Sequence, residues 1–150
     1  MWVETSSNFG TPLCDVATCG FGGGTGPFAG TYWSWFGGVD FFAPVLPEVA
    51  TLSQALTIPV GTATLEFQLE IPACDSSFDT FAIKVDNTPV FSKNGGDSLC
   101  GQVGYTLQTV NLNAYANGGV HTVLFESVHQ AYNFGATNFM VDNIQLIACL

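Results

Sequence analysis

Apolar and polar residues alternate along several short segments of the chain, and the clearest of them is Thr62–Ile71. Every second residue of that segment is apolar, namely Ala63, Leu65, Phe67, Leu69 and Ile71. A period of two residues is typical of a strand with one buried face, and the roughly 3.6-residue spacing of an amphipathic helix is almost absent from the sequence. The pattern therefore predicts an all-β protein.

The predicted strands are short, and stretches rich in Gly, Asn, Asp and Pro separate them. Besides Thr62–Ile71 they are Trp2–Thr5, Thr31–Phe36, Thr51–Thr57, Phe81–Val85, a return strand that starts at Val90, Tyr105–Leu112, Val120–Val128 and Asn138–Leu146. About eight strands at this spacing favour a two-sheet antiparallel β-sandwich with jelly-roll topology. No linker or repeat interrupts the pattern, so we expect residues 1–150 to form a single domain.

The charge balance narrows the classes of partner. Acidic residues number 12 against two cations, Lys84 and Lys93, which gives a net charge of −10. A nucleic-acid interface needs cations against the phosphates, and an anionic membrane would repel this surface. No apolar run is long enough for a membrane-spanning helix. We therefore expect no nucleic-acid partner and no membrane insertion, whereas neutral glycans and divalent cations are suitable ligands.

Five cysteines lie at positions 14, 19, 74, 100 and 149, without the two close pairs typical of a zinc site. Disulfides fit better. Of the three connectivities that four cysteines allow, we favour Cys14–Cys19, which closes a small loop, and Cys74–Cys100, which joins the ends of a hairpin; Cys149 is left over. Disulfides and scarce lysine indicate an extracellular or cell-surface protein. The N-terminus lacks the features of a signal peptide, so we expect a processed secreted protein or a segment of a longer chain or assembly.

Asp142 is the most informative polar residue. Within Phe139–Leu146, strict alternation groups it with Met140, Ile144 and Leu146, which predicts a carboxylate on the core face. A buried carboxylate needs a partner, and the chain has almost no cations to pair with it. Oxygen ligands favour a structural Ca²⁺ ion. The alternative is a carboxylate that accepts backbone N–H bonds at a strand end.

The first strand and the glycine-rich stretch Cys19–Gly30 are the expected sources of further calcium ligands. This stretch lacks the lysine and the following helix of a phosphate-binding loop, so we expect it to present carbonyl oxygens to a cation instead. Besides Asp142, the expected ligands are Glu4, Gly24, Thr25 and, more weakly, Asp40. Such a site would tie the first and last strands together.

Several short motifs follow one another along the chain. They are Gly26-Pro27-x-x-Gly30, Trp33-x-Trp35-Phe36-Gly37-Gly38, Leu52-Ser53-Gln54, Ile58-Pro59-x-Gly61 and Thr137-Asn138-Phe139-x-Val141-Asp142-Asn143-Ile144. In this order they resemble bacterial secreted jelly-roll modules of the MAM-like and carbohydrate-binding type. The resemblance implies a structural calcium ion with Asp142 and Glu4 as ligands. The Cys14–Cys19 loop departs from both groups.

Aromatic side chains offer surfaces on which sugar rings stack, although with 13 Phe most aromatic rings must fill the core. The candidates for glycan contact are Tyr32, Trp35 and Tyr132, together with Glu66 and Gln68 on the polar face of Thr62–Ile71.

Catalysis is not expected. No G-x-S-x-G motif is present, and Glu66 and Glu70, roughly 13 Å apart along one strand at ~3.3 Å per residue, are too far apart for a glycosidase pair. The predicted function is a non-catalytic, extracellular glycan-binding or adhesion module with structural calcium. The alternative is a structural subunit or spacer domain of an extracellular assembly, such as a filament, a surface layer or a multidomain adhesin.

Overall fold

The computed structural model describes residues 1–38, 46–130 and 135–149, and these residues form ten strands and two short helical turns. The strands are β1 (Val3–Ser6), β2 (Leu13–Asp15), β3 (Tyr32–Phe36), β4 (Glu48–Thr57), β5 (Thr62–Ala73), β6 (Thr80–Val85), β7 (Thr88–Asn94), β8 (Gln102–Asn111), β9 (Val120–His129) and β10 (Asn138–Cys149). The helical turns are α1 (Val16–Cys19) and the 3₁₀ turn η1 (Asn113–Tyr115). In these residues no helix is long and apolar enough to cross a membrane.

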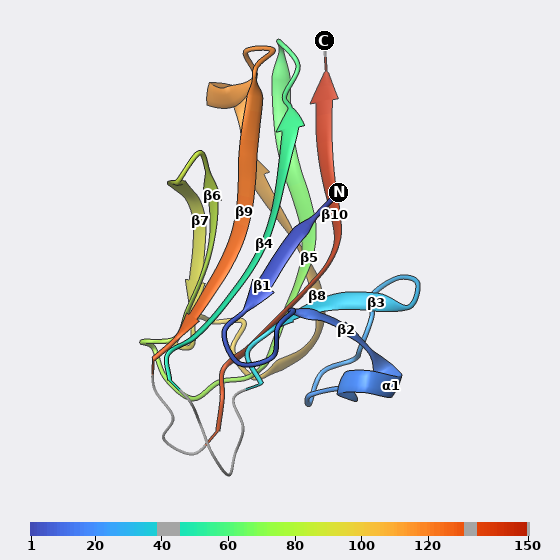
Figure 1. Cartoon of the computed structure of the whole chain (residues 1–150), viewed down its shortest axis with the longest axis vertical. Coiled ribbons are helices and arrows are strands. Elements are labelled where there is room, and N and C mark those ends of the chain that lie inside the picture. Colours follow the sequence, from blue (N-terminus) through green and yellow to red (C-terminus); the bar gives the residue numbers. More distant parts are fainter. Residues whose placement is uncertain (39–45, 131–134, 150) are drawn as a thin grey trace.

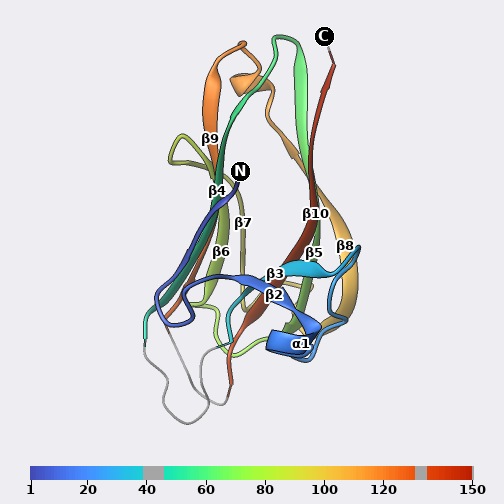
Figure 2. The ribbon, with the colours of Figure 1, turned by 45° about the vertical axis from the view of Figure 1, so that its right-hand side comes forward.

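The strands form two antiparallel five-stranded sheets that face each other (Figure 1, Figure 2). The first sheet has the order β1-β4-β9-β6-β7 and the second the order β2-β3-β10-β5-β8. Strands β3 to β10 have the order of a jelly roll: successive strands lie in opposite sheets, except for β6 and β7, which form a hairpin in the first sheet. β1 and β2 extend the two sheets at their edges. The predicted all-β sandwich is confirmed.

Alternating residues of both sheets fill the space between them. Phe67 of β5, Phe81 of β6 and Phe125 of β9 are all fully buried, and their rings meet at edge or at a tilt. The alternation seen in Thr62–Ile71 continues into this core, where Leu65 and Leu69 flank Phe67. Burial of these side chains is the main force that holds the sheets together.

The last strand departs from strict alternation. The pairing of β10 with β5 shifts between Asp142 and Gln145, and Asn143 has a φ of 49°. Such a β-bulge places one extra residue on the outer side of the strand. Ile144 and Leu146 therefore pack against the core, whereas Met140 belongs to a smaller cluster outside the second sheet. The predicted grouping of Asp142 with Ile144 and Leu146 is wrong, because the carboxylate lies on the outer face.

The first and last strands do not pair with each other. β1 is the edge strand of the first sheet and pairs with β4, while β10 lies between β3 and β5 in the second sheet. Glu4 and Asp142 consequently belong to different sheets, and the expected link between the chain ends through these strands is not formed.

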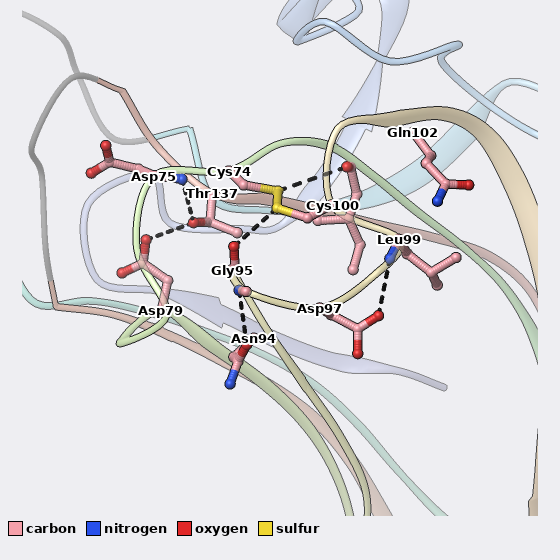
Figure 3. The surroundings of a disulfide bond; sticks show 12 residues. Cys74, Asp75, Asp79, Asn94, Gly95, Asp97, Leu99, Cys100, Gln102 and Thr137 are labelled. Atoms are coloured by element: carbon pink, nitrogen blue, oxygen red, sulfur yellow. Dashed lines mark hydrogen bonds between the residues drawn. A yellow bond between two sulfur atoms is a disulfide. The ribbon is translucent and has the colours of Figure 1, made fainter.

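Both predicted disulfides are present. Cys14–Cys19 closes a loop around α1, and Cys74–Cys100 brackets the hairpin of β6 and β7. Beside the second disulfide, the hydroxyl of Thr137 donates to Asp79 at 2.7 Å and accepts the Asp75 N–H at 3.0 Å (Figure 3). These contacts connect the start of β10 with the start of β6. Cys149 is an exposed free thiol.

Candidate functional site

The segment from β2 to β3 covers the lower part of the outer face of the second sheet (Figure 2). Beneath it lies a second small core of Cys14, Trp33 and Met140, with Cys19, Trp35 and Tyr105 packed around it. Close packing explains the glycines: a Cβ atom on Gly22 would lie 2.4 Å from the Trp35 ring, and one on Gly24 would lie 2.6 Å from the Met140 sulfur. The glycines let the backbone approach the sheet closely, and we call residues 13–30 the covering segment.

A pocket of about 360 Å³ lies between the covering segment, the β1–β2 turn and the end of β3. Its apolar lining comes from Phe9, Leu13, Trp35 and the Cys14–Cys19 disulfide. Its polar lining includes Ser6, Thr11, Thr18 and Glu48. Small-molecule sites typically start at about 300 Å³, so the pocket suits a ligand of one or a few rings.

Hydrogen bonds fix the orientation of Trp35 at the pocket wall. Its indole N–H donates to the Asn138 Oδ1 at 3.0 Å, and the Gly38 N–H donates to the same oxygen at 3.0 Å. The Asn138 amide in turn donates to the Gly22 carbonyl at 3.1 Å. The start of β10, the end of β3 and the covering segment therefore hold one aromatic ring in place.

Glu48 stabilises the β1–β2 turn, which forms another part of the pocket lining. Its carboxylate is fully buried and accepts the hydroxyl of Ser6 at 2.5 Å, the hydroxyl of Ser7 at 2.8 Å and the N–H of Asn8 at 2.9 Å. A buried carboxylate without hydrogen-bond donors would raise the free energy of the folded state. These three bonds are therefore expected to hold the β1–β2 turn against β4. Phe9, which is 50 % exposed, is part of this fixed turn.

Two further carboxylates anchor the covering segment to the sheet. Glu70, 1 % exposed, accepts the N–H and hydroxyl of Thr25 at 3.2 and 3.0 Å and the N–H of Gly104 at 2.6 Å. Asp142 accepts the N–H groups of Phe28 and Ala29 at 2.7 and 3.0 Å. N–H and hydroxyl donors, rather than lysine or arginine side chains, therefore stabilise these two carboxylates.

Tyr105 completes this anchorage by donating its hydroxyl to the Gly26 carbonyl at 2.8 Å. Burial, and then the nearby carboxylates of Glu70 and Asp142, raise the pKa of this hydroxyl above its ordinary value. The phenol therefore stays protonated and keeps its donor role.

The predicted calcium ligands are not brought together. Glu4 accepts the hydroxyl of Thr11 at the edge of the first sheet, and Thr25 meets Glu70 rather than Asp142. The second carboxylate oxygen of Asp142 accepts the Asn143 N–H at 2.6 Å, so both of its oxygens face N–H donors. Asp40 lies outside the described residues, and in the described ones no group of three His, Cys, Asp or Glu could hold a metal. These residues do not fit one calcium ion at Asp142, and calcium stays a prediction.

The predicted glycan contacts fall in different places. Trp35 lines the pocket, while Tyr32, 62 % exposed, lies on the same strand opposite Asp15 and outside the pocket lining. Glu66 and Gln68 are half-buried on β5, on the outer face of the second sheet and outside the pocket lining. Tyr132 lies outside the described residues.

Pocket residues that the sequence did not predict include Phe9, Thr11, Leu13 and Thr18. They belong to the turn before β2, to β2 itself and to α1, none of which has the alternation used to find the strands. The predicted Cys14–Cys19 disulfide was the available signal, because a disulfide over so short a loop forces nearby side chains into a compact group.

The described residues of the pocket do not form a catalytic set. Glu48 is the one carboxylate among the described lining residues, whereas glycoside hydrolysis uses a pair. Ser127 and His129 are fully buried within the sandwich and do not line the pocket. His121 bonds Asp86 and Asn117 at 2.6 and 3.0 Å, and it also lies outside the lining.

Comparison with solved structures identifies other domains of the same architecture. The carbohydrate-binding module TmCBM61, solved in complex with β-1,4-galactotriose, matches with a TM-score of 0.61 and 16 % identity over 98 % of this chain and 88 % of that one. The K1 cleaved adhesin domain of Lys-gingipain from Porphyromonas gingivalis W83 matches with a TM-score of 0.56 and 15 % identity over 99 % of both chains.

An enzyme shares the architecture as well. The Stig cyclase Fisc from Fischerella sp. TAU matches with a TM-score of 0.53 and 13 % identity over 97 % of this chain and 83 % of that one. No protein-family model matches the sequence, and no curated protein matches it either. At these identities the likeness concerns the fold, and function has to be argued from the site.

Proposed function

We propose that the protein is a non-catalytic module that binds a neutral glycan in the pocket beside Trp35. The observation that carries the proposal is the pocket itself, in which a fixed indole ring and Phe9 stand beside the hydroxyl groups of Thr11 and Thr18. Sugars present apolar C–H faces that pack on aromatic rings and hydroxyls that bond to polar neighbours. A site of a few polar groups within an apolar lining suits such a ligand.

Charge selects neutral sugars over acidic ones. Both cations are engaged elsewhere, since Lys84 of β6 pairs with Glu126 at 2.5 Å and Lys93 of β7 pairs with Asp97 at 2.9 Å. Neither lysine lines the pocket, and the chain carries a net charge of −10. A uronic acid or sulfated sugar would enter this field without a counter-charge, so we expect binding to be confined to uncharged glycans.

The cellular setting follows from the cysteines. Two disulfides persist in oxidising surroundings, which supports an extracellular or cell-surface location. The carbohydrate-binding module and the adhesin domain among the structural neighbours support the same setting for a binding domain of this shape. A non-catalytic role is supported by the single carboxylate among the described lining residues.

A glycan array tests the proposal, with the protein as it is and with two pocket variants. Phe9→Ala removes an exposed ring, and Trp35→Ala removes the fixed indole. We expect wild type to bind neutral but not acidic glycans, and each variant to lose about tenfold or more in affinity.

Tyr32→Ala is the matched control, because it removes an exposed aromatic ring of the same strand outside the pocket lining. Its binding should equal that of wild type. Phe9→Ala keeps the test sound if Trp35→Ala unfolds the small core. Binding that survives both pocket variants, or an array on which only acidic glycans bind, would contradict the proposal.

A further inference from the structure

The upper half of β10 has a free backbone edge. β3 pairs with β10 only from Phe139 to Val141, whereas β5 pairs with it as far as Cys149. Among the described residues no strand lies on the other side of residues 143–149, and no backbone partner is found there beyond β5. Figure 1 shows this stretch beside β5, with no strand drawn on its other side up to the C-terminus. We call residues 143–149 the free edge.

The four outermost strands of the sheets are protected in ways that the free edge is not. β1 carries Glu4, β2 carries Asp15 and β7 carries Lys93. β8 contains Gly104 at a φ of 111°, and its pairing with β5 is interrupted by a register shift. Charges and bulges of this kind keep sheet edges from pairing with another chain.

The free edge has the composition of a strand that pairs. Residues 143–149 contain no charged residue and no proline, and the sequence from Ile144 to Cys149 is mostly apolar. Ile144 and Leu146 point toward the core and are only half-buried, while Gln145 and Ile147 point outward and are exposed. The bulge of β10 lies at Asn143 and Ile144, at the lower end of this stretch, and the pairing with β5 from Gln145 to Cys149 is regular.

The same flank of the sandwich is open in the first sheet. β1 covers β4 only from Ala50 to Ser53, so residues 54–57 have no described partner on that side. Leu56 is half-buried against the core there. An added strand would therefore cover apolar side chains as well as form backbone hydrogen bonds.

We propose that the free edge pairs with the free edge of a second copy of this chain, antiparallel and about a two-fold axis at Leu146. Residues that lie opposite each other in an antiparallel pair point to the same face of the sheet. Two copies of one strand meet this condition only when the two-fold axis passes a residue, because side chains alternate with a period of two. With Leu146 on the axis, Ile144 lies opposite Ala148 of the second copy and Gln145 lies opposite Ile147. The two second sheets then continue across the interface as one sheet.

If two copies meet, charge favours this edge over the other surfaces of the chain. Each chain carries a net charge of −10, so most surfaces of two copies repel each other. The free edge brings seven uncharged residues of each chain together and places no like charges opposite one another. It is a different surface from the pocket, and dimerisation does not depend on the proposed glycan binding.

Two double variants of the full chain test the pairing, both in a Cys149→Ser background that removes intermolecular disulfides. Gln145→Lys with Ile147→Lys places lysine opposite lysine twice across the axis. Gln145→Lys with Ile147→Glu changes the same two outward side chains but places lysine opposite glutamate. Sedimentation equilibrium from micromolar to millimolar protein measures the dimer dissociation constant, and circular dichroism checks that each chain is folded.

The chain that carries Cys149→Ser alone should dimerise. The lysine–lysine variant should weaken the dimer by about tenfold or more, and the lysine–glutamate variant should restore it. A wild-type chain that stays monomeric up to millimolar concentration overturns the proposal. A dimer that the lysine–lysine variant leaves unchanged, or one that Cys149→Ser alone abolishes, overturns it as well.

Discussion

The interior between the two sheets and the covering segment outside the second sheet are held together by different forces. In the interior, alternating apolar residues from both sheets pack ring against ring around Phe67, Phe81 and Phe125. In the covering segment, glycines allow close approach, a disulfide closes a short loop, and the carboxylates of Glu70 and Asp142 bond the backbone to the sheet.

The interior and the covering segment therefore have different roles: the first mainly provides stability, and the second shapes the proposed binding pocket. Burial of large side chains is spread over the whole sandwich and specifies the fold, whereas a few directed bonds shape the pocket on its surface. The covering segment packs outside the core between the two sheets. The pocket is therefore expected to respond to substitutions that barely affect the free energy of unfolding of the sandwich.

The largest expected effect comes from the interior. Phe125→Ala removes a fully buried ring that contacts Trp2, Phe67 and Phe81. The resulting cavity should lower the free energy of unfolding by about 3–5 kcal/mol, as urea denaturation measures. Phe28→Ala, at a half-exposed ring of the covering segment, is the control and should have a far smaller effect. Equal losses of unfolding free energy in Phe125→Ala and Phe28→Ala would contradict the view that the interior carries most of the stability.

The next effect comes from the disulfide of the covering segment. Replacing Cys14 and Cys19 by serine removes a cross-link over a sequence separation of 5 residues. In the chain-entropy model this lowers stability by about 2 kcal/mol. Glycan affinity should fall strongly because the disulfide lines the pocket, while far-UV circular dichroism keeps its β spectrum. Cys149→Ser should change neither quantity, and unaltered glycan affinity in the double variant would refute the role of the disulfide.

A pH effect of intermediate size should come from the interior. Burial lowers the pKa of His129 below its ordinary value of 6.5, although Asp79 and Glu48 act in the opposite direction. The unfolded chain therefore binds a proton more readily than the folded one. This contribution to stability is complete above pH 6.5 and declines as the pH falls from there toward the folded pKa. Urea denaturation of wild type and His129→Gln across this range should show a shallower decline in the variant; parallel curves would contradict it.

Asp142→Asn should have a smaller, local effect. The amide is a weaker acceptor for the N–H groups of Phe28 and Ala29, so the loop should open more often at a cost of about 1 kcal/mol. Hydrogen exchange should accelerate at these two amides and not in β9. Glu66→Gln, on the same outer face, should leave both amides unchanged, and equal exchange in all three proteins would count against the anchoring role.

The smallest effect should be that of calcium. The resemblance and the alternation predicted a calcium ion at Asp142, but the carboxylate there faces three backbone N–H donors. From these contacts we expect the same melting temperature in millimolar calcium and in chelator. A decrease of several degrees on chelation, absent in Asp142→Ala, would restore the calcium prediction.

Regular alternation made the fold readable from the sequence. Thr62–Ile71 became part of β5, and its alternate apolar residues all face the core. Val120–Val128 became part of β9, where Val123 and Phe125 face the same core. The spacing of the cysteines gave both disulfides. Such features are local in the chain, and a periodic pattern or a short loop is enough to reveal them.

The site was less readable because its contacts join residues far apart in the sequence. A single bulge at Asn143 moved Asp142 away from the face that alternation assigned to it. Glu48 is a fully buried carboxylate that no pattern marked, since its donors lie 40 to 42 residues away, at the end of β1 and in the turn after it. Trp35 was predicted as a glycan contact, but its neighbours in the pocket come from segments with no period at all.

An NMR titration of the isotope-labelled protein with a neutral oligosaccharide from the array tests the central claim most directly. The pocket account predicts that saturable amide shifts gather at Phe9, Thr11, Thr18, Gly37 and Gly38, all of which line the pocket. Amides of β6, β7 and the free edge should stay in place. Shifts that gather on Glu66 and Gln68 instead, with the pocket amides unmoved, would contradict the claim that the pocket is the glycan site.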